Sequence, residues 1–218
     1  MSERDQMLRE IEREVEYTSS MIGRSRLDER VMQAMRDVPR HEFVPSGAQG
    51  QAYYNGPLPI GHGQTISQPY IVALMTDLLE PQPSDRILEI GTGSGYQAAV
   101  LSQLVEQVYS LEVIAPLSSL AADRFDRLGY TNIKCRVGNG HHGWPEAAPF
   151  DGIIVTAAAP MVPPALVEQL KPGGNLVIPV GQPHYHQDLI VIEKDLQGET
   201  SMKNILGVAF VPMVRREP

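Results

Sequence analysis

Apolar and polar positions follow a regular order from residue 84 onward. Short apolar runs predict strands, and stretches with apolar side chains at helical spacing predict helices between most of these strands. This order predicts an α/β fold with a doubly wound, parallel sheet and helices on both of its faces. The expected strands are residues 86–90, 108–112, 133–137, 152–156 and 175–180, and the expected helices are residues 96–104, 115–128 and 164–170.

Two later apolar runs, residues 189–193 and 206–211, have no clear helix between them. Strands joined without a crossover helix pair in antiparallel fashion, so we expect an antiparallel edge on the mostly parallel sheet. Residues 171–174, Lys-Pro-Gly-Gly, predict a tight turn that leads into the fifth strand.

The first 80 residues follow a different pattern. Apolar residues at helical spacing predict two helices, the second of which ends before Pro39. Their apolar positions are Met7, Leu8, Ile11 and Val15 in the first helix and Val31, Met32 and Met35 in the second. Residues 39–69 are rich in Gly and Pro, and irregular segments of this length are usually functional. We expect residues 1–80 to form helices and an active-site loop within the same domain as a core of residues 81–218.

Residues 86–95 read Arg-Ile-Leu-Glu-Ile-Gly-Thr-Gly-Ser-Gly. A strand that turns into a helix through glycines brings backbone N–H groups close to a ligand. A dinucleotide-binding turn would have its third glycine where this chain has Tyr96. The Glu-x-Gly-x-Gly-x-Gly spacing instead resembles the first motif of class I S-adenosyl-L-methionine-dependent methyltransferases.

Glu112 ends the second expected strand. It lies about as far beyond the glycines as the carboxylate that binds ribose in doubly wound folds. A carboxylate can accept hydrogen bonds from two neighbouring ribose hydroxyls. The alternative interpretation is a surface glutamate at the end of a strand.

Composition narrows the classes of function. A net charge of −8 argues against a nucleic-acid partner, since phosphate binding normally requires an excess of Lys and Arg. No apolar stretch approaches a membrane span, and the charged N-terminus does not resemble a signal peptide. The single cysteine, Cys135, fits a reducing cytoplasm, and its neighbours Ile133 and Val137 predict a buried strand residue rather than a reactive thiol. We expect one cytoplasmic domain without a membrane partner, monomeric by default.

Residues 38–45, Val-Pro-Arg-His-Glu-Phe-Val-Pro, and residues 58–69, Leu-Pro-Ile-Gly-His-Gly-Gln-Thr-Ile-Ser-Gln-Pro, strongly resemble protein-L-isoaspartate O-methyltransferases. The resemblance continues through residues 89–95, 151–160, 170–174, 179–181 and 208–212. It implies a Rossmann-like methyltransferase sheet with added terminal elements. It also implies methyl transfer from S-adenosyl-L-methionine to the α-carboxylate of L-isoaspartyl residues in damaged proteins and peptides, with S-adenosyl-L-homocysteine as product.

This chemistry needs no general base, because the sulfonium is already an electrophile and a carboxylate with a pKa of about 4 is ionised at neutral pH. Positioning in a dry site is then sufficient. The resemblance implies that Ser67 is the catalytic residue, and Thr65 is also suited to orient a carboxylate. Two alternatives for Ser67 are a covalent nucleophile, with His62 as base but without a Gly-x-Ser-x-Gly elbow, and a turn hydroxyl bonded to its own backbone.

The expected cofactor contacts are Thr65, Ile66, Ser67, Glu89, Gly91, Thr92, Gly93, Gly95, Glu112, Gly138, Asn139 and Gly140. The expected substrate contacts are Thr65, Ser67, Ala158 and Pro160. The family usually has Gly-Asp-Gly where this chain has Gly138-Asn139-Gly140. An amide oxygen can still accept the adenine amino proton, although Asn-Gly also favours a left-handed turn on its own.

Four histidines, His141, His142, His184 and His186, raise the possibility of a metal site. No acidic or cysteine cluster accompanies them at ligand spacing, so we expect solvated loop histidines and no metal. We expect Trp144 to pack a loop onto the domain. Two other functions stay open: a methyltransferase for a small carboxylate or hydroxyl acceptor, and a cofactor-binding protein without catalysis.

Overall fold

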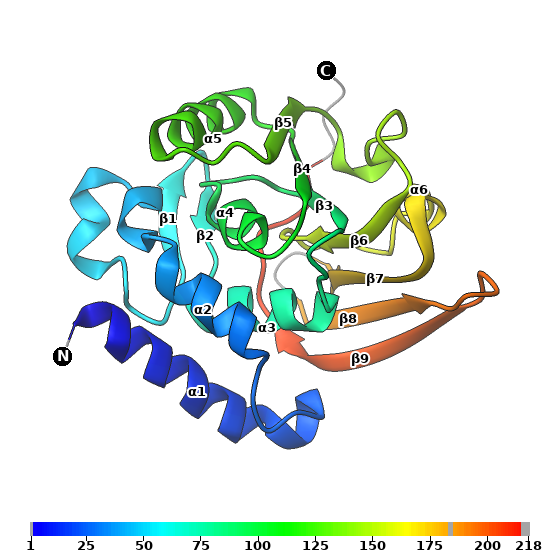
Figure 1. The fold of residues 1–218 in the computed structure, drawn as a ribbon, viewed down its shortest axis with the longest axis horizontal. Coiled ribbons are helices and arrows are strands. Elements are labelled where there is room, and N and C mark those ends of the chain that lie inside the picture. Colours follow the sequence, from blue (N-terminus) through cyan, green and yellow to red (C-terminus); the bar gives the residue numbers. More distant parts are fainter. Residues whose placement is uncertain (1, 183–184, 215–218) are drawn as a thin grey trace.

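A computed structural model describes residues 2–182 and 185–214. Within these residues a seven-stranded sheet has the order β5-β4-β3-β6-β7-β8-β9 (Figure 1). Strands β3 to β7 pair in parallel, and β8 and β9 add an antiparallel edge, as expected. The strands are β3 Arg86–Ile90, β4 Gln107–Glu112, β5 Ile133–Val137, β6 Phe150–Val155, β7 Leu170–Gly181, β8 Gln187–Lys194 and β9 Thr200–Val208.

Each face of the sheet has its own hydrophobic core, because neighbouring side chains of a strand point to opposite faces. Ile87 and Val108 belong to the core shared with α3 (Pro69–Leu79), α4 (Tyr96–Ser102) and α5 (Ala115–Leu128). Leu88 and Tyr109 face the other way, toward α6 (Pro164–Gln169) and the loop of Trp144. The Trp144 ring packs edge-on against Tyr109 at a centroid distance of 5.4 Å, which confirms its expected packing role.

The two expected N-terminal helices are present as α1 (Glu3–Ile22) and α2 (Glu29–Asp37). Both helices pack against α3, and α1 also contacts the edge strand β9 (Figure 1). Helix α1 begins with a reciprocal pair of hydrogen bonds between Ser2 and Asp5 and ends at the left-handed Gly23. No helix within the described ranges is both long and apolar enough to cross a membrane.

Sequence periodicity did not predict helix α3. Nearly all of its side chains are buried, so it lacks the polar face that marks a surface helix. Pro69 occupies its first turn, where a missing N–H costs nothing, and the Asn55 side-chain oxygen accepts a hydrogen bond from the Tyr70 amide at 3.1 Å. Helix α3 therefore directs its N-terminus, and the residues just before it, toward the carboxyl edge of the sheet.

The segment of residues 39–69 contains more regular structure than we expected. It forms two short 3₁₀ helices, Arg40–Phe43 and Ser46–Gln51, and then an antiparallel hairpin of β1 (Leu58–Gly61) and β2 (Gln64–Ile66). The hairpin is short and turns through His62 and Gly63, which both have positive φ.

Two expectations about the strands are wrong. Residues 171–174 belong to β7 instead of forming a separate turn, and the pairing of β7 with β6 is irregular there. The last strand covers Thr200–Val208 instead of residues 206–211, because its polar N-terminal half lies on the exposed edge and lacks an apolar pattern.

The expectation of a buried Cys135 is also wrong. Strand β5 is an edge strand, so Cys135 is half-buried and its neighbour Val137 is exposed. Burial nevertheless raises the pKa of the Cys135 thiol to about 12, so the reactive thiolate is disfavoured.

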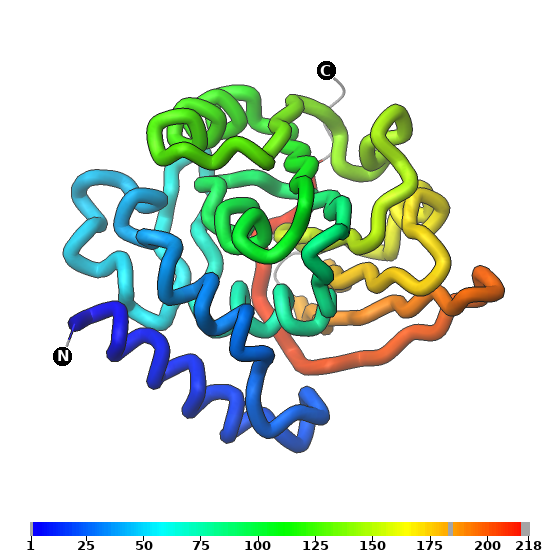
Figure 2. Tube along the Cα trace, viewed as in Figure 1, coloured from blue at the N-terminus to red at the C-terminus, as the bar shows by residue number. Residues whose placement is uncertain are grey.

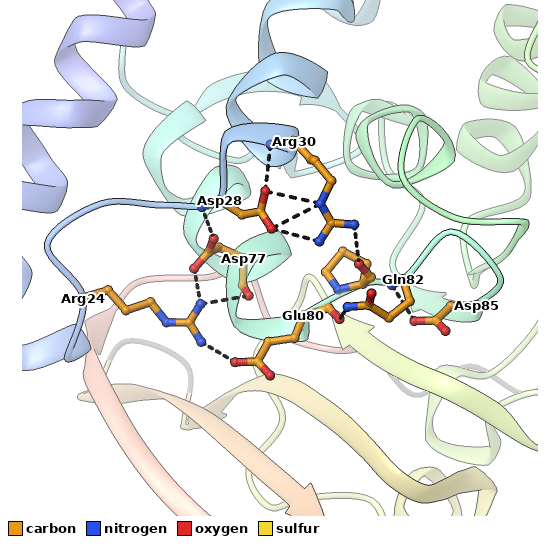
Figure 3. Close-up of polar contacts among 8 residues, drawn as sticks. Arg24, Asp28, Arg30, Asp77, Glu80, Gln82 and Asp85 are labelled. Carbon is orange, nitrogen blue, oxygen red and sulfur yellow. Dashed lines mark hydrogen bonds and ion pairs between the residues drawn. The ribbon is translucent and has the colours of Figure 1, made fainter.

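A buried carboxylate, that of Asp77, fixes the connection between α1 and α2 to the C-terminal end of α3 (Figure 3). Its side chain is 1% exposed and accepts hydrogen bonds from Arg24 Nη1 and, at 2.6 Å, from the Asp28 amide. Arg24 also pairs with Glu80 at 2.7 Å, but that side chain is 61% exposed.

We expect Asp77→Asn to lower the free energy of unfolding by about 2–3 kcal/mol, because a charged acceptor of two hydrogen bonds is lost in a buried position. Glu80→Gln is the matched control and should cost at most about 1 kcal/mol, since its ion pair is exposed. Urea unfolding of the three proteins measures both changes. Equal losses for the two variants would contradict this role of Asp77.

Candidate active site

The three glycines after β3 form a turn that no other residue would adopt easily. Gly91, Gly93 and Gly95 have φ values of 97°, 51° and 89°. A Cβ atom on Gly91 would lie 2.4 Å from Thr156 Oγ1, and one on Gly95 would lie 2.6 Å from the Phe125 ring. The turn therefore needs glycine both for its backbone angles and for its close packing against β6 and α5.

Glu112 joins this turn to the end of β4. Its Oε2 accepts a hydrogen bond from the Gly93 amide at 2.8 Å, and its Oε1 accepts one from the Ile114 amide at 2.9 Å. The residue is 6% exposed, which excludes the surface glutamate considered above. Each carboxylate oxygen keeps a second lone pair for a ligand hydroxyl.

A cavity lies against the turn at the carboxyl edge of the sheet, where the chain order reverses between β3 and β6. We call it the glycine-turn cavity, and its free volume is about 50 Å³. Five residues of the expected site line it: Thr65, Gly91, Gly93, Glu112 and Gly140. The remaining wall includes residues 211–214, which follow β9 and appear in the middle of the view in Figure 2.

A second cavity of about 460 Å³ contains Ser67, and we call it the Ser67 cavity. Thr65, Thr156 and Val211 line both cavities, so the two adjoin each other. The Ser67 hydroxyl makes no hydrogen bond to another described residue, unlike a hydroxyl that stabilises its own turn. His62 is exposed in the hairpin turn and lines neither cavity.

Glu89 and Thr92 lie beneath the turn rather than in either cavity. Glu89 is completely buried, and Ser110 donates a short hydrogen bond to its carboxyl group. The Ser110 and Thr92 hydroxyls are in turn 2.6 Å apart. Burial raises the pKa of the Glu89 carboxyl to about 8, against the lowering effect of the Ser110 hydrogen bond, and the nearby Glu112 raises it further.

The other residues of the expected site lie around the cavities. Ile66 belongs to the hydrophobic core, and Gly138 packs closely against Leu111. Asn139 has φ −80° and accepts a hydrogen bond from the His141 amide at 3.0 Å, so it caps the short helix Gly140–His142 instead of forming a left-handed turn. Ala158 is buried and Pro160 is exposed, and neither lines these two cavities.

Sequence reasoning missed Thr156, which lies at the junction of the two cavities. Its amide donates to the Ile90 carbonyl at 2.9 Å, and its hydroxyl donates to the Gly91 carbonyl at 2.6 Å. The sequence offered one indication of this role: Thr156 is the first polar residue after the apolar run of the fourth parallel strand. The contacts of Val211 and Met213 with Ala158, at 2.8 Å each, had no such signal, because they join segments that are distant in sequence.

The histidines occupy separate places. His186 lines the Ser67 cavity and hydrogen-bonds to Asp188 at 2.8 Å, while His141 and His142 lie in the short helix after β5. His184 lies outside the described residues. Across residues 2–182 and 185–214, no three side chains of metal-binding type come together.

The Tyr70 hydroxyl contacts Thr18 of α1, away from both cavities.

A family model described as protein-L-isoaspartate(D-aspartate) O-methyltransferase (PCMT) matches residues 18–218. The chain belongs to this family. The protein-L-isoaspartate O-methyltransferase 2 of Syntrophobacter fumaroxidans is 58% identical over 210 residues, which cover 96% of this chain and 85% of the relative. The protein-L-isoaspartate O-methyltransferase 1 of Cupriavidus necator is 56% identical over 212 residues, covering 97% and 82% of the two chains.

Solved structures of PCMT proteins share the fold. One protein-L-isoaspartate O-methyltransferase superposes with a TM-score of 0.83 at 26% identity over 96% of this chain, which spans 65% of that longer protein. A Plasmodium falciparum protein assigned as a protein-L-isoaspartate O-methyltransferase, in complex with S-adenosyl-L-homocysteine, gives a TM-score of 0.80 at 25% identity. That alignment covers 99% of this chain and 100% of the Plasmodium chain.

The buried Glu89 predicts a distinctive pH dependence of stability. Its pKa of about 8 in the folded protein exceeds the ordinary value of 4.5, so the folded state binds more protons between these values. This contribution to the unfolding free energy is greatest at low pH and declines, by at most about 1.4 kcal/mol per pH unit, until pH passes 8. In the Glu89→Gln variant this pH-dependent contribution to the free energy of unfolding is absent, because glutamine does not titrate.

We therefore expect the stability of Glu89→Gln relative to wild type to increase steadily from pH 5.5 to 8.5. Denaturant unfolding of both proteins without ligand measures this difference, in which the titration of groups that do not interact with Glu89 cancels. A difference that is independent of pH would contradict the raised pKa.

Proposed function

We propose that the protein transfers a methyl group from S-adenosyl-L-methionine to the α-carboxylate of L-isoaspartyl residues in damaged proteins and peptides. The observation that carries this proposal is the junction of the glycine-turn cavity with the Ser67 cavity at Thr65 and Thr156. The glycine-turn cavity contains the glycine turn whose spacing resembles that of methyltransferases. The Ser67 cavity contains the serine of the segment 58–69, which resembles the family. The names of the relatives support the same activity.

Backbone amides of the glycine turn and the carboxylate of Glu112 are the groups that would hold the cofactor, with the ribose hydroxyls at Glu112 and the adenine beside Asn139 and Gly140. The S-adenosyl-L-homocysteine in the Plasmodium structure supports S-adenosyl-L-methionine as the cofactor. The donor and acceptor set fits, because Glu112 retains free lone pairs. When bound, the cofactor supplies an electrophilic methyl group on a sulfonium.

The glycine-turn cavity, at about 50 Å³, is far smaller than the roughly 300–1,000 Å³ of ordinary small-molecule sites. Binding must therefore displace part of its wall. Residues 211–214 belong to no named helix or strand and are joined to Ala158 by the hydrogen bonds of Val211 and Met213, so we expect the displacement there.

On the substrate side, Ser67 and Thr65 orient the carboxylate, and Ala158 and Pro160 contribute through the loop that follows β6. His186 lines the same cavity but hydrogen-bonds to Asp188, and no described histidine hydrogen-bonds to Ser67, which argues against a serine nucleophile. Ser67 accordingly acts by positioning an acceptor that is already ionised. Residues 1–80 supply the active-site loop, and residues 81–218 form the S-adenosyl-L-methionine-binding core, which also contributes Ala158 and Pro160 to the substrate side.

The proposed partners are isoaspartyl proteins and peptides, not nucleic acid, which the net charge of −8 disfavours. The single cysteine supports a reducing cytoplasm as the location. A monomer is sufficient for this function, because both cavities are built from one chain.

The test is incubation of the protein with labelled S-adenosyl-L-methionine and one peptide in its isoaspartyl and aspartyl forms. We expect label in the isoaspartyl form alone. Label in neither form would favour a cofactor-binding protein, and label only in small carboxylate or hydroxyl acceptors would favour the other methyltransferase.

We expect Ser67→Ala to lower kcat by about 5- to 150-fold, which corresponds to about 1–3 kcal/mol for a lost orienting hydroxyl. The Kd of the cofactor should not change, since Ser67 lines only the other cavity. Ser46→Ala, at an exposed position away from both cavities, is the control. Steady-state rates measure kcat, and calorimetry measures the Kd of the cofactor. An unchanged kcat would show that Ser67 has no part in the mechanism.

Glu112→Gln should weaken cofactor binding at least about five-fold while the protein stays folded, because a neutral acceptor loses about 1 kcal/mol or more relative to a carboxylate. Titration calorimetry measures the affinity, and circular dichroism checks the fold. If the two proteins bind the cofactor equally well, Glu112 only stabilises the turn.

A further inference from the structure

Arg40 is a buried cation that joins two segments beneath the Ser67 cavity. Its side chain is completely inaccessible to solvent. Its Nε donates a hydrogen bond to the Ala52 carbonyl at 2.8 Å, and its Nη2 donates one to the Ser67 carbonyl at 2.7 Å. The guanidinium carbon lies 4.7 Å from the centre of the Tyr96 ring.

This arrangement is costly to maintain. No ion pair with a carboxylate is recorded for Arg40 within the described residues, and its Nη1 has no hydrogen-bond partner there. Burial accordingly lowers the pKa of Arg40 below its ordinary value. A buried arginine is normally compensated by a carboxylate, whereas here two carbonyl groups and one aromatic face take that place. An apolar side chain could fill the same space at lower cost, so what distinguishes the guanidinium is its pair of hydrogen bonds to the Ala52 and Ser67 carbonyls.

What it holds is the backbone of Ser67. This residue lies between the end of β2 and the first turn of α3, and its hydroxyl has no hydrogen-bond partner among the described residues. The backbone therefore sets the position of the Ser67 Cβ atom, from which the hydroxyl reaches the Ser67 cavity. The planar guanidinium donates in two fixed directions and so sets the Ser67 carbonyl relative to Ala52.

We propose that Arg40 is a positioning residue for the methyl transfer. It fixes the Ser67 backbone so that the Ser67 side chain lies in the Ser67 cavity. This inference rests on the proposed function. It assigns Arg40 no contact with substrate or cofactor, since Arg40 lines neither cavity.

The test is a double-mutant cycle between Arg40→Lys and Ser67→Ala. Lysine keeps the charge, but its single ammonium group cannot reproduce the fork between the two carbonyls. We expect Arg40→Lys to lower kcat roughly 10- to 100-fold for the isoaspartyl peptide, because small displacements of orienting groups are costly. The Kd of the cofactor should stay unchanged. In the Ser67→Ala background the same change should cost less than about two-fold.

Asp77→Asn is the control for lost stability, because Asp77 lies at the opposite end of α3 from Ser67. It should leave kcat unchanged below its unfolding temperature in both backgrounds. If Arg40→Lys does not fold, the neutral Arg40→Gln replaces it in the cycle. Equal losses of kcat with and without the Ser67 hydroxyl, or no loss at all, would overturn the proposal.

Hydrogen exchange of residues 64–68 gives a readout that does not depend on turnover. We expect faster exchange of this segment in Arg40→Lys than in wild type, with no change in Asp77→Asn. Unchanged exchange would overturn the proposal even for an inactive protein. Wild-type protein that methylates no isoaspartyl peptide would instead reject the proposed function, which the exchange experiment does not address.

Discussion

The hydrogen bond between the Gly93 amide and the Glu112 carboxylate is the interaction on which the site depends. It ties the glycine turn after β3 to the end of β4, so the ends of two neighbouring strands act as one rigid unit. Thr156 extends this unit to β6 through its hydrogen bond to the Gly91 carbonyl. The second contact requires bare glycine backbone, because a Cβ atom on Gly91 would lie 2.4 Å from the Thr156 hydroxyl oxygen. The same carboxylate that holds the turn keeps free lone pairs, so in the proposed function one group both stabilises the turn and binds the cofactor.

The N-terminal residues complete the site from the other side. Helix α3 is buried on nearly all sides, and its position fixes where the preceding residues, including Ser67, meet the sheet edge. Arg40 adds a second constraint at Ser67 from beneath. The ion pair of Asp77 with Arg24 and its hydrogen bond from the Asp28 amide hold the far end of α3 (Figure 3). A rigid support of this kind suits a reaction that needs orientation and exclusion of water more than proton transfer.

Local sequence predicted the parts of this structure that depend on local pattern. The apolar runs at β3, β4 and β6 and the glycine spacing led to the parallel sheet and to the turn, because buried parallel strands are apolar throughout. Helix α3 escaped prediction because burial on all sides removes helical periodicity. Cys135 was misjudged because an apolar strand pattern does not distinguish an edge strand from a central one. The approach of Val211 and Met213 to Ala158 is a long-range contact that no local pattern encodes.

The central claim is that cofactor and isoaspartyl carboxylate occupy two adjoining cavities of one chain. A crystal structure of the protein with S-adenosyl-L-homocysteine and an isoaspartyl peptide tests it most directly. The account predicts ribose hydroxyls at Glu112, the peptide α-carboxylate within hydrogen-bond distance of Ser67 or Thr65, and the cofactor sulfur at the wall shared by Thr65 and Thr156. A peptide carboxylate bound outside the Ser67 cavity, or a nucleoside away from the glycine turn, would contradict it.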